Sequence, residues 1–175
     1  MEVALQWLNK AAENKNHEAL FSLGIINHQG ADKITADPKV AAGFFKRAFI
    51  EGKAEAAAYL AEYAYAGNGR DKDTIEALMW LKLATEISST VQGGALSEDS
   101  FNRLSQNKDF IESTLNAEQI TDAKTRMDQF MKDNSFHFRL RRTIFYSTKE
   151  AFFHSWVYDY KGMLYITSWR NTFIS

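Results

Sequence analysis

One pattern of apolar and polar positions occurs three times in the first half of the chain. Small and bulky apolar residues stand at i, i+3, i+4 and i+7, so they share one face of an α-helix. The nine-residue segment that begins at Ala4 returns with similar residues at Ala41 and again at Ala77, at intervals of 37 and 36 residues. Such a period is typical of proteins built from stacked helical repeats.

A second helix fits into each period after the first. It carries the pattern Ala-x-x-x-Leu, followed by a glycine, and its positions agree between the copies: Ala19 with Ala56, Leu23 with Leu60, and Gly30 with Gly67. Two helices with one apolar face each predict an antiparallel pair that stacks on the next pair. The predicted helices span residues 2–14, 17–28, 38–50, 54–66 and 74–88.

The segments between these helices contain the residues that begin and end helices. Gly67-Asn68-Gly69 tolerates the positive φ that a helix end requires. Asp73, with Glu76 three residues later, has the spacing of a capping box. In the preceding copy, Asp37 is followed by Pro38, and proline favours the first helical position. We therefore expect Asp37 and Asp73 to cap the helices that follow them.

A later amphipathic segment predicts one more helix, from Asn116 to Lys132. Asn116 and Gln119 again have capping-box spacing. The apolar residues of the segment form a single stripe: Ile120, Ala123, Met127, Phe130 and Met131. A stack of repeats leaves an apolar face bare at its end. We expect this helix to cover the face left by residues 77–88.

Composition restricts the classes of protein to which the chain can belong. It has 175 residues, a net charge of −1 and no cysteine. The missing cysteines exclude disulfides, thiol catalysis and zinc–thiolate sites, and the balanced charge gives no general attraction to nucleic acid or an anionic membrane. No apolar run reaches the roughly 20 residues of a membrane span. The sequence as given has no signal-peptide pattern, so we expect a cytoplasmic protein. If the chain is a fragment of a longer precursor, a periplasmic or secreted location is expected instead.

Residues with catalytic potential do not combine into a known arrangement. The four histidines lack the spacing of metal ligands, and the acidic residues within 71–76 lack the full spacing of a calcium loop. No serine lies in a Gly-x-Ser-x-Gly elbow. We therefore expect no catalytic residue, no metal site and no cofactor. The bulky aromatic position of the three copies is expected in the repeat core: Trp7, Phe44 and Trp80.

The last forty residues differ in composition from the rest. The net charge is −5 over residues 1–135 and +4 over residues 136–175, and the second segment holds 12 of the 24 aromatic residues. Residues 136–144 alternate in a strand pattern, and 156–160 and 163–167 predict a hairpin around Lys161-Gly162. Three interpretations stay open: a small β-appendage, a poorly ordered segment or frameshift product, and a binding patch.

The repeated motifs resemble the Sel-1-like repeats, which are relatives of the tetratricopeptide repeats. The family pattern reads Ala-x-x-Trp-(Leu/Tyr)-x-Lys-Ala-Ala-x-x-Gly, then Ala-x-x-x-Leu-Gly-x-x-Tyr-x-x-Gly-x-Gly-x-x-x-Asp. The segment from Gly67 to Trp80 matches its linker and next helix, Leu23-Gly24 matches the Leu-Gly pair, and Gly52 matches the mid-repeat glycine. The resemblance covers two full repeats and the opening helix of a third, from Ala4 to Thr85.

Three positions depart from the family pattern. The second copy has Leu60-Ala61 in place of Leu-Gly, Lys15 replaces the mid-repeat glycine of the first copy, and the linker from Gly30 to Asp37 lacks a second glycine. The first repeat starts at residue 4 without a cap, which suggests upstream repeats. The resemblance implies an all-α fold, an α-α superhelix or solenoid of helix pairs over residues 1–135. Residues 136–175, which have no counterpart in the family pattern, are expected to form a short C-terminal appendage, for which a β-hairpin is one interpretation.

The resemblance also implies a function as a protein–protein interaction scaffold or adaptor, without catalysis. A solenoid binds a partner's peptide or helix in a preorganised groove. The groove is expected along the solvent-facing positions of each first helix: Gln6, Asn9, Glu13, Gly43, Lys46, Ile50, Met79, Lys82 and Glu86. The oligomeric state stays open.

Two other functions compete with the scaffold interpretation. Interleaved arginines and aromatics in the tail, such as Arg139 and Phe138, are of the kind that bind single-stranded nucleic acid. The balanced net charge of the whole chain makes nucleic acid a less favoured partner than a protein. Some secreted members of the family were described as β-lactamase-like, but they carry a disulfide in each repeat, and this chain has no cysteine.

Overall fold

A computed structural model describes residues 2–31, 34–90, 96–134, 155–158 and 164–167. The chain divides into two compact units, Met1–Thr143 and Ile144–Ser175. The described part of the first unit is helical, and that of the second is a pair of short strands. The predicted all-α solenoid with a short C-terminal appendage is therefore confirmed, whereas the predicted domain boundary at residue 135 stays a prediction.

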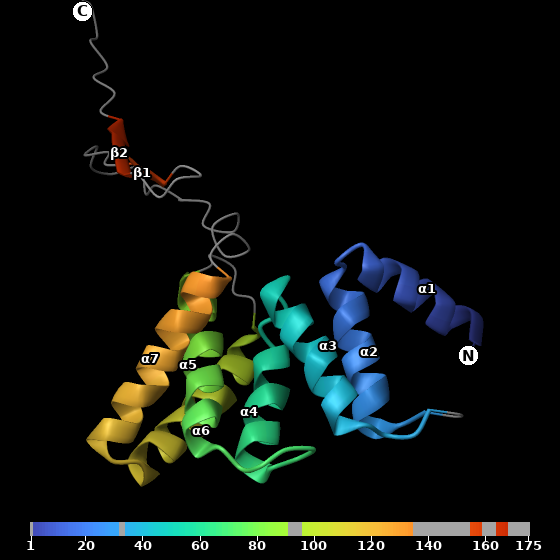
Figure 1. Cartoon of the computed structure of the whole chain (residues 1–175), viewed down its shortest axis with the longest axis horizontal. Helices are drawn as coiled ribbons and strands as arrows, with labels where there is room; N and C mark the ends of the chain where they lie inside the picture. Colours follow the sequence, from blue (N-terminus) through green and yellow to red (C-terminus); the bar gives the residue numbers. More distant parts are fainter. Residues whose placement is uncertain (1, 32–33, 91–95, 135–154, 159–163, 168–175) are drawn as a thin grey trace, which may run out of the picture. The chain divides into compact units, whose positions relative to one another are not determined.

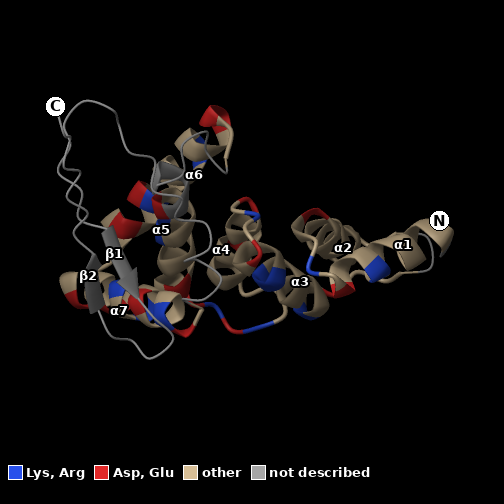
Figure 2. Ribbon diagram, turned by 90° about the horizontal axis from the view of Figure 1, so that it is seen from above, with Lys and Arg blue, Asp and Glu red and all other residues tan. Residues whose placement is uncertain are grey.

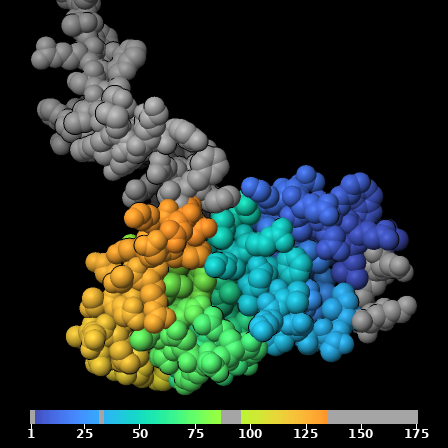
Figure 3. Space-filling model, in the orientation of Figure 1, coloured from blue at the N-terminus to red at the C-terminus, as the bar shows by residue number. Residues whose placement is uncertain are grey.

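From the first described helix to the sixth, each helix packs against the next, and the seventh packs against the fifth (Figure 1). Their bounds are α1 Glu2–Glu13, α2 His17–Gln29, α3 Pro38–Ile50, α4 Ala56–Ala66, α5 Thr74–Thr90, α6 Glu98–Thr114 and α7 Ala117–Asp133. Consecutive segments form adjacent bands on the surface of this unit (Figure 3). The six helices predicted from the sequence are present within two residues of the expected bounds.

Helix α6 was not expected from the sequence. Its N-cap is Ser97, whose side-chain oxygen accepts a hydrogen bond from the backbone N–H of Ser100. Only Leu104 and Ile111 of its 17 residues are buried. Because its apolar stripe is so narrow, the periodicity that reveals the other helices is weak here.

The predicted caps are confirmed atom by atom. One carboxylate oxygen of Asp37 accepts hydrogen bonds from the backbone N–H groups of Lys39 and Val40 at 2.9 and 3.1 Å. Asn116 and Gln119 form a complete capping box at the start of α7. Gly30 and Gly67 end α2 and α4 with φ values of +75° and +77°. Glycine therefore recurs at this position of the repeat because the backbone at the helix end adopts a positive φ.

Aromatic rings join successive helices through the core. The Phe45 ring in α3 stacks on Tyr59 in α4 at 4.5 Å between centroids and meets Phe21 of α2 at 5.6 Å. Tyr63 of α4 is 1% exposed, and its hydroxyl hydrogen-bonds His28 Nδ1 of α2 at 2.6 Å. Burial, with the nearby Glu62 charge, raises the pKa of Tyr63 to about 12. Phe45 and Tyr63 thus hold α2, α3 and α4 together.

The aromatic position of the three copies does not have the same environment in each. Trp80 is 3% exposed, as predicted, and Phe44 is half-buried, but Trp7 is 66% exposed. The expectation of a core role for Trp7 was therefore wrong. Helix α1 packs against α2, whereas α5 packs against α4, α6 and α7. With fewer neighbours, α1 leaves Trp7 and Val3 in solvent.

The second unit contains an antiparallel hairpin. Strand β1, Ser155–Tyr158, pairs with β2, Leu164–Thr167, in the register Ser155 opposite Thr167 and Tyr158 opposite Leu164. Strand β2 lies within the predicted segment 163–167, and β1 overlaps the predicted segment 156–160 but begins one residue earlier. The predicted turn at Lys161-Gly162, the strand at 136–144 and the basic aromatic residues Arg139 and Phe138 lie outside the described residues.

Candidate functional site

The positions predicted to line a groove lie on α1, α3 and α5, and most of them face solvent. Six are exposed: Gln6, Asn9, Glu13, Gly43, Lys46 and Glu86. Ile50 and Lys82 are half-buried, and Met79 is only 6% exposed. The assignment of Met79 to a solvent-facing groove was therefore wrong. Whether the exposed members bind a partner stays a prediction.

The burial of Met79 follows from the position of α5. This helix is flanked by α4, α6 and α7, so it lacks the broad solvated face of an end helix. Lys82 of α5 donates to a Glu112 carboxylate oxygen of α6 at 2.9 Å, which places its ammonium group in an intramolecular ion pair. Because α6 was not foreseen, the sequence assigned to solvent a part of α5 that this helix covers.

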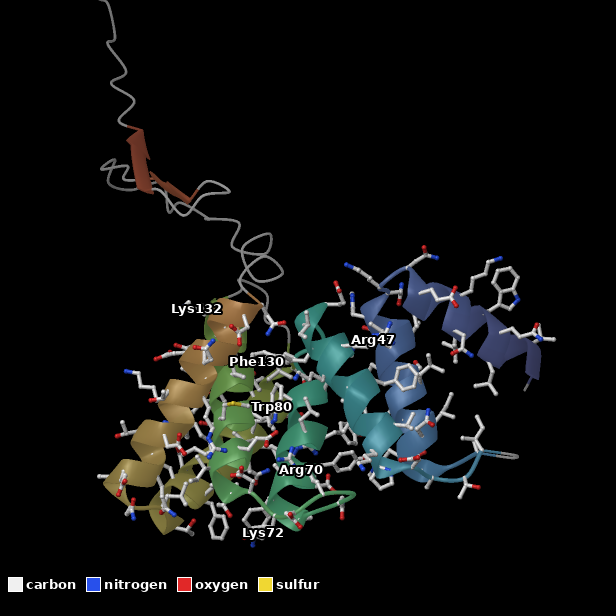
Figure 4. All side chains as sticks on the ribbon, viewed as in Figure 1. Arg47, Arg70, Lys72, Trp80, Phe130 and Lys132 are labelled. Carbon is white, nitrogen blue, oxygen red and sulfur yellow. The ribbon has the colours of Figure 1, made fainter. Side chains whose placement is uncertain are left out.

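Helix α7 packs on α5, as its apolar stripe predicts, and it also reaches α3. The Phe130 ring lies 5.0 Å from the Trp80 ring between centroids (Figure 4). The centroid of the Phe49 ring is 6.1 Å from that of Phe130. The Lys46 ammonium lies 5.7 Å from the centroid of the Phe130 ring. Part of the predicted groove face on α3 and α5 is therefore already occupied by the chain's own last helix.

A charged network fixes the start of α5 against α7. One oxygen of Asp73 accepts from the Glu76 backbone N–H at 2.8 Å, which confirms the predicted cap, and the other accepts from Arg126 at 2.7 Å. Arg126 also pairs with Asp122 at 2.9 Å. Figure 2 shows red and blue residues close together along α7. Burial alone raises the pKa of Asp73, but the Glu76 N–H and the Arg126 guanidinium outweigh burial, so this pKa lies below its ordinary value.

The loop before α5 extends the same network. Arg70 makes a two-pronged ion pair with Glu76, and the other contact of Glu76 is the indole N–H of Trp80 at 3.1 Å. The open depression at this corner has a volume of about 660 Å³ and is lined by charged and polar residues. Since both Arg70 and Arg126 are paired within the protein, we assign this corner a structural role.

A second groove runs between α4 and α6, and its lining is mostly apolar. It has a volume of about 510 Å³. Its residues come from three helices: Ala58, Tyr59, Ala61, Glu62 and Tyr65 of α4, Leu81 of α5, and Arg103, Leu104, Asn107, Phe110 and Ile111 of α6. Two aromatic side chains on it are large and exposed, Phe110 at 59% and Tyr65 at 38%. Apolar surface of this kind marks interaction sites more often than isolated surface residues do.

Charged groups on this α4–α6 groove are few and lie on different helices. Glu62 contributes a carboxylate on the α4 side, and Arg103 contributes a guanidinium on the α6 side. Beside the groove, the Lys72 ammonium lies 4.3 Å from the centroid of the Tyr65 ring. That cation–π contact orients the exposed Tyr65 side chain.

The family model of the Sel1 repeat matches residues 1–16, 17–52 and 54–88. The chain belongs to the Sel1 repeat family. The second match contains the pair α2 with α3, and the third contains α4 with all but the last two residues of α5. The sequence pattern alone places the Ala-x-x-Trp helix first in each pair, whereas the family model begins with the Ala-x-x-x-Leu helix. Helices α3 and α5 are thus the second helices of their repeats.

A solved structure has the same fold. It is a protective antigen of uropathogenic Escherichia coli that displays an SLR fold, with a TM-score of 0.60 and 23% sequence identity. The match covers 87% of this chain and 30% of that protein, so this chain spans less than a third of its length. No curated protein matches the chain.

The Sel1 repeat assignment carries a general functional expectation. Sel1 repeat proteins are generally protein-interaction scaffolds and are typically non-catalytic. Among the described residues, no helix is both long and apolar enough to cross a membrane. Within the same residues, no three His, Cys, Asp or Glu side chains gather as metal ligands.

The α4–α6 groove escaped the sequence analysis because one of its walls, α6, was not predicted. The signals for that wall are present in the sequence. Ser97 stands at a cap position, and Phe101, Leu104 and Ile111 recur at three- and seven-residue spacing. The pattern is typical of one narrow helical face.

Proposed function

We propose that this Sel1 repeat protein is a non-catalytic scaffold that binds a peptide or helix of a partner protein in the α4–α6 groove. The observation that carries the proposal is the exposure of two aromatic side chains, Phe110 and Tyr65, on a mostly apolar groove. Aromatic side chains on a rigid wall are the usual anchors of a binding interface. Both walls are helices, so the site is formed before the partner arrives and little ordering entropy is lost.

The exposed positions of α1 and α3 are the alternative surface within the same function. Gln6, Asn9 and Lys46 remain in solvent and can contact a partner. They lack a groove lined by aromatic residues, and α7 already contacts this side through Phe130 and Lys46. The α4–α6 groove is therefore our first choice, and the α1–α3 surface is an outcome of the experiment.

A peptide library displayed on phage tests the proposal. Peptides selected on the intact protein are measured against Phe110→Ser, which removes an exposed aromatic from the groove. The matched control is Trp7→Ser, which removes a similarly exposed aromatic side chain on α1. We expect the Phe110 variant to lose at least about tenfold in affinity, as an anchor residue does, and the Trp7 variant to bind normally.

Two outcomes would contradict the proposal. If the library yields no specific peptide, the protein is not a peptide-binding scaffold. If the selected peptides bind Phe110→Ser normally but fail to bind Lys46→Ala, the partner occupies the α1–α3 surface instead. Circular dichroism of each variant verifies that its helices are intact, which the exposure of all three side chains predicts.

A further inference from the structure

The arginines of the described residues have different degrees of pairing. Arg47 donates to the Ala12 carbonyl oxygen at 3.2 Å and lies over the Phe44 ring. Arg70 and Arg126 are ion-paired with acidic side chains. Within the described part of the chain, Arg103 alone among the arginines has no hydrogen bond or ion pair, and it lines the α4–α6 groove. Its guanidinium offers five N–H donors to a ligand.

Arg103 belongs to a stripe along α6 that faces the groove. Asn107 follows one turn later and Phe110 about one turn after that, and both line the groove. Both side chains are exposed, and Asn107 has no hydrogen-bond partner among the described residues. Along this stripe the wall of α6 changes from a cation, through an amide, to an aromatic ring. Seven residues at 1.5 Å each separate its ends by about 10 Å.

The opposite wall determines where an acidic group can bind. Glu62 places a negative charge on the α4 side of the groove. A carboxylate of a ligand is repelled there and attracted to Arg103 on the α6 side. Tyr65, on the same side as Glu62, offers apolar surface with a hydroxyl at its end.

We propose that the α4–α6 groove takes an acidic amphipathic helix of a partner protein, with a carboxylate paired to Arg103 and an apolar side chain seven residues away packed on Phe110. This inference rests on the proposed function and specifies the chemistry of the partner. A third helix suits a groove walled by two helices. A carboxylate is the group that a planar guanidinium binds with two parallel hydrogen bonds.

The test uses three synthetic, alanine-based helical peptides of about 18 residues, long enough to form helix in water. Each peptide carries a leucine, and the three peptides differ only at the position seven residues away, which is glutamate, glutamine or lysine. Fluorescence anisotropy measures their affinities for the wild-type protein. We expect the glutamate peptide to bind about fivefold to tenfold tighter than the glutamine peptide, as a charge-assisted hydrogen bond predicts, and the lysine peptide to bind weakest.

Variants of the protein assign this preference to one side chain. Arg103→Gln should abolish the preference for glutamate over glutamine, and Arg103→Glu should reverse the order so that the lysine peptide binds best. The matched control is Lys124→Gln, which removes an exposed cation from α7 away from the groove residues. It should leave all three affinities unchanged. Arg103 is exposed, so its replacement should not unfold the protein.

The outcomes separate this inference from the proposed function. Equal affinities for the three peptides, an effect of Lys124→Gln as large as that of Arg103→Gln, or no binding of the glutamate peptide would overturn the acidic partner. In each of those cases, loss of library-selected peptides in Phe110→Ser would still support a peptide-binding groove. If the library peptides also ignore Phe110, both proposals fail together.

Discussion

Gly24 in α2 lies so close to the Phe45 ring in α3 that a Cβ at Gly24 would stand 2.5 Å from Phe45 Cε1. Real Cβ atoms essentially never approach a carbon so closely, and the Phe45 ring is fully buried among other side chains. In the next repeat the equivalent residues are Ala61 and Leu81. A larger residue on α4 is thus matched by a smaller one on α5.

The first prediction concerns this pair of residues. Gly24→Ala should lower the free energy of unfolding by about 1–3 kcal/mol, as overpacked cores do. Phe45→Leu should destabilise on its own through lost contacts, but the double variant reproduces the Ala61–Leu81 combination. Its cost should be smaller than the sum of the single costs by at least about 0.5 kcal/mol. Urea denaturation of the four proteins measures this coupling, and strictly additive costs would show that the two sites do not touch.

Gly43 provides the control for Gly24. It lies inside α3, it is exposed, and a Cβ built on it would meet nothing within 4 Å. Because glycine costs a helix interior about 0.5–1 kcal/mol relative to alanine, Gly43→Ala should raise the stability. The same substitution is therefore expected to have opposite signs at the two glycines.

The second prediction compares two tryptophans at equivalent positions of the repeats. Trp80→Ala should destabilise by about 3–5 kcal/mol, because it opens a cavity between Phe49 and Phe130. Trp7→Ala removes a side chain that is 66% exposed and should change stability by less than about 1 kcal/mol. Chemical denaturation measures both. Similar losses in the two variants would contradict the different burial of the two rings.

The third prediction concerns the two roles of Asp73. Asp73→Ala removes the cap of α5, at a cost of about 0.5–2 kcal/mol, together with the Arg126 ion pair. Asp73→Asn keeps a capping oxygen and loses the charge pair, which is partly exposed and contributes less than about 1 kcal/mol. Because asparagine caps a helix about as well as aspartate, loss of the Arg126 ion pair should be the main cause of any destabilisation in Asp73→Asn. The total cost of this substitution should therefore be small. Denaturant melts of both variants at neutral pH measure these costs.

The pH dependence of stability separates the charge from the cap. The pKa of Asp73 is lower in the folded protein than in the unfolded chain. Its ionised form therefore stabilises the fold above the unfolded pKa of about 4, and this contribution is lost as the pH falls through the folded value. The difference in stability between wild type and Asp73→Asn should shrink below about pH 4. A difference that stays constant down to pH 2 would show that the carboxylate charge contributes nothing.

The fourth prediction concerns Lys15, which occupies the turn between α1 and α2 with φ of +59°. The equivalent residue of the next repeat is Gly52, with φ of +105°. A non-glycine residue in the left-handed region carries strain of about 1–2 kcal/mol. Lys15→Gly should raise the melting temperature by relieving it. An unchanged or lower melting temperature would show that Lys15 stabilises the turn through its side chain.

The repeats, their caps and the all-α fold were predictable because each rests on local sequence. The spacing of Ala77 and Trp80, the cap at Asp73 and the glycine at Gly67 act within one helix or turn. All of these signals recur at the same interval of 36 or 37 residues, which is typical of helical-repeat proteins and of few other folds. The hairpin at 155–158 and 164–167 was likewise indicated by its own residues.

The groove and the environments of equivalent residues were not predictable in this way, because they depend on neighbouring helices. Met79 is buried and Trp7 exposed although both stand in repeated patterns, since α5 has three helical neighbours and α1 packs on α2. Helix α6, with few buried residues, gives only a weak periodic signal. The α4–α6 groove has α6 as one wall, so without that helix the sequence analysis assigned the groove to the exposed positions of α1, α3 and α5.

Amide resonances of the isotope-labelled protein, followed by NMR during titration with a peptide selected from the library, test most directly whether a partner lies between α4 and α6. We predict that the largest shifts occur at groove residues such as Tyr65, Arg103 and Phe110, with little change on α1. Shifts concentrated instead at exposed positions of α1 and α3, such as Gln6 and Lys46, would contradict the α4–α6 groove as the binding site.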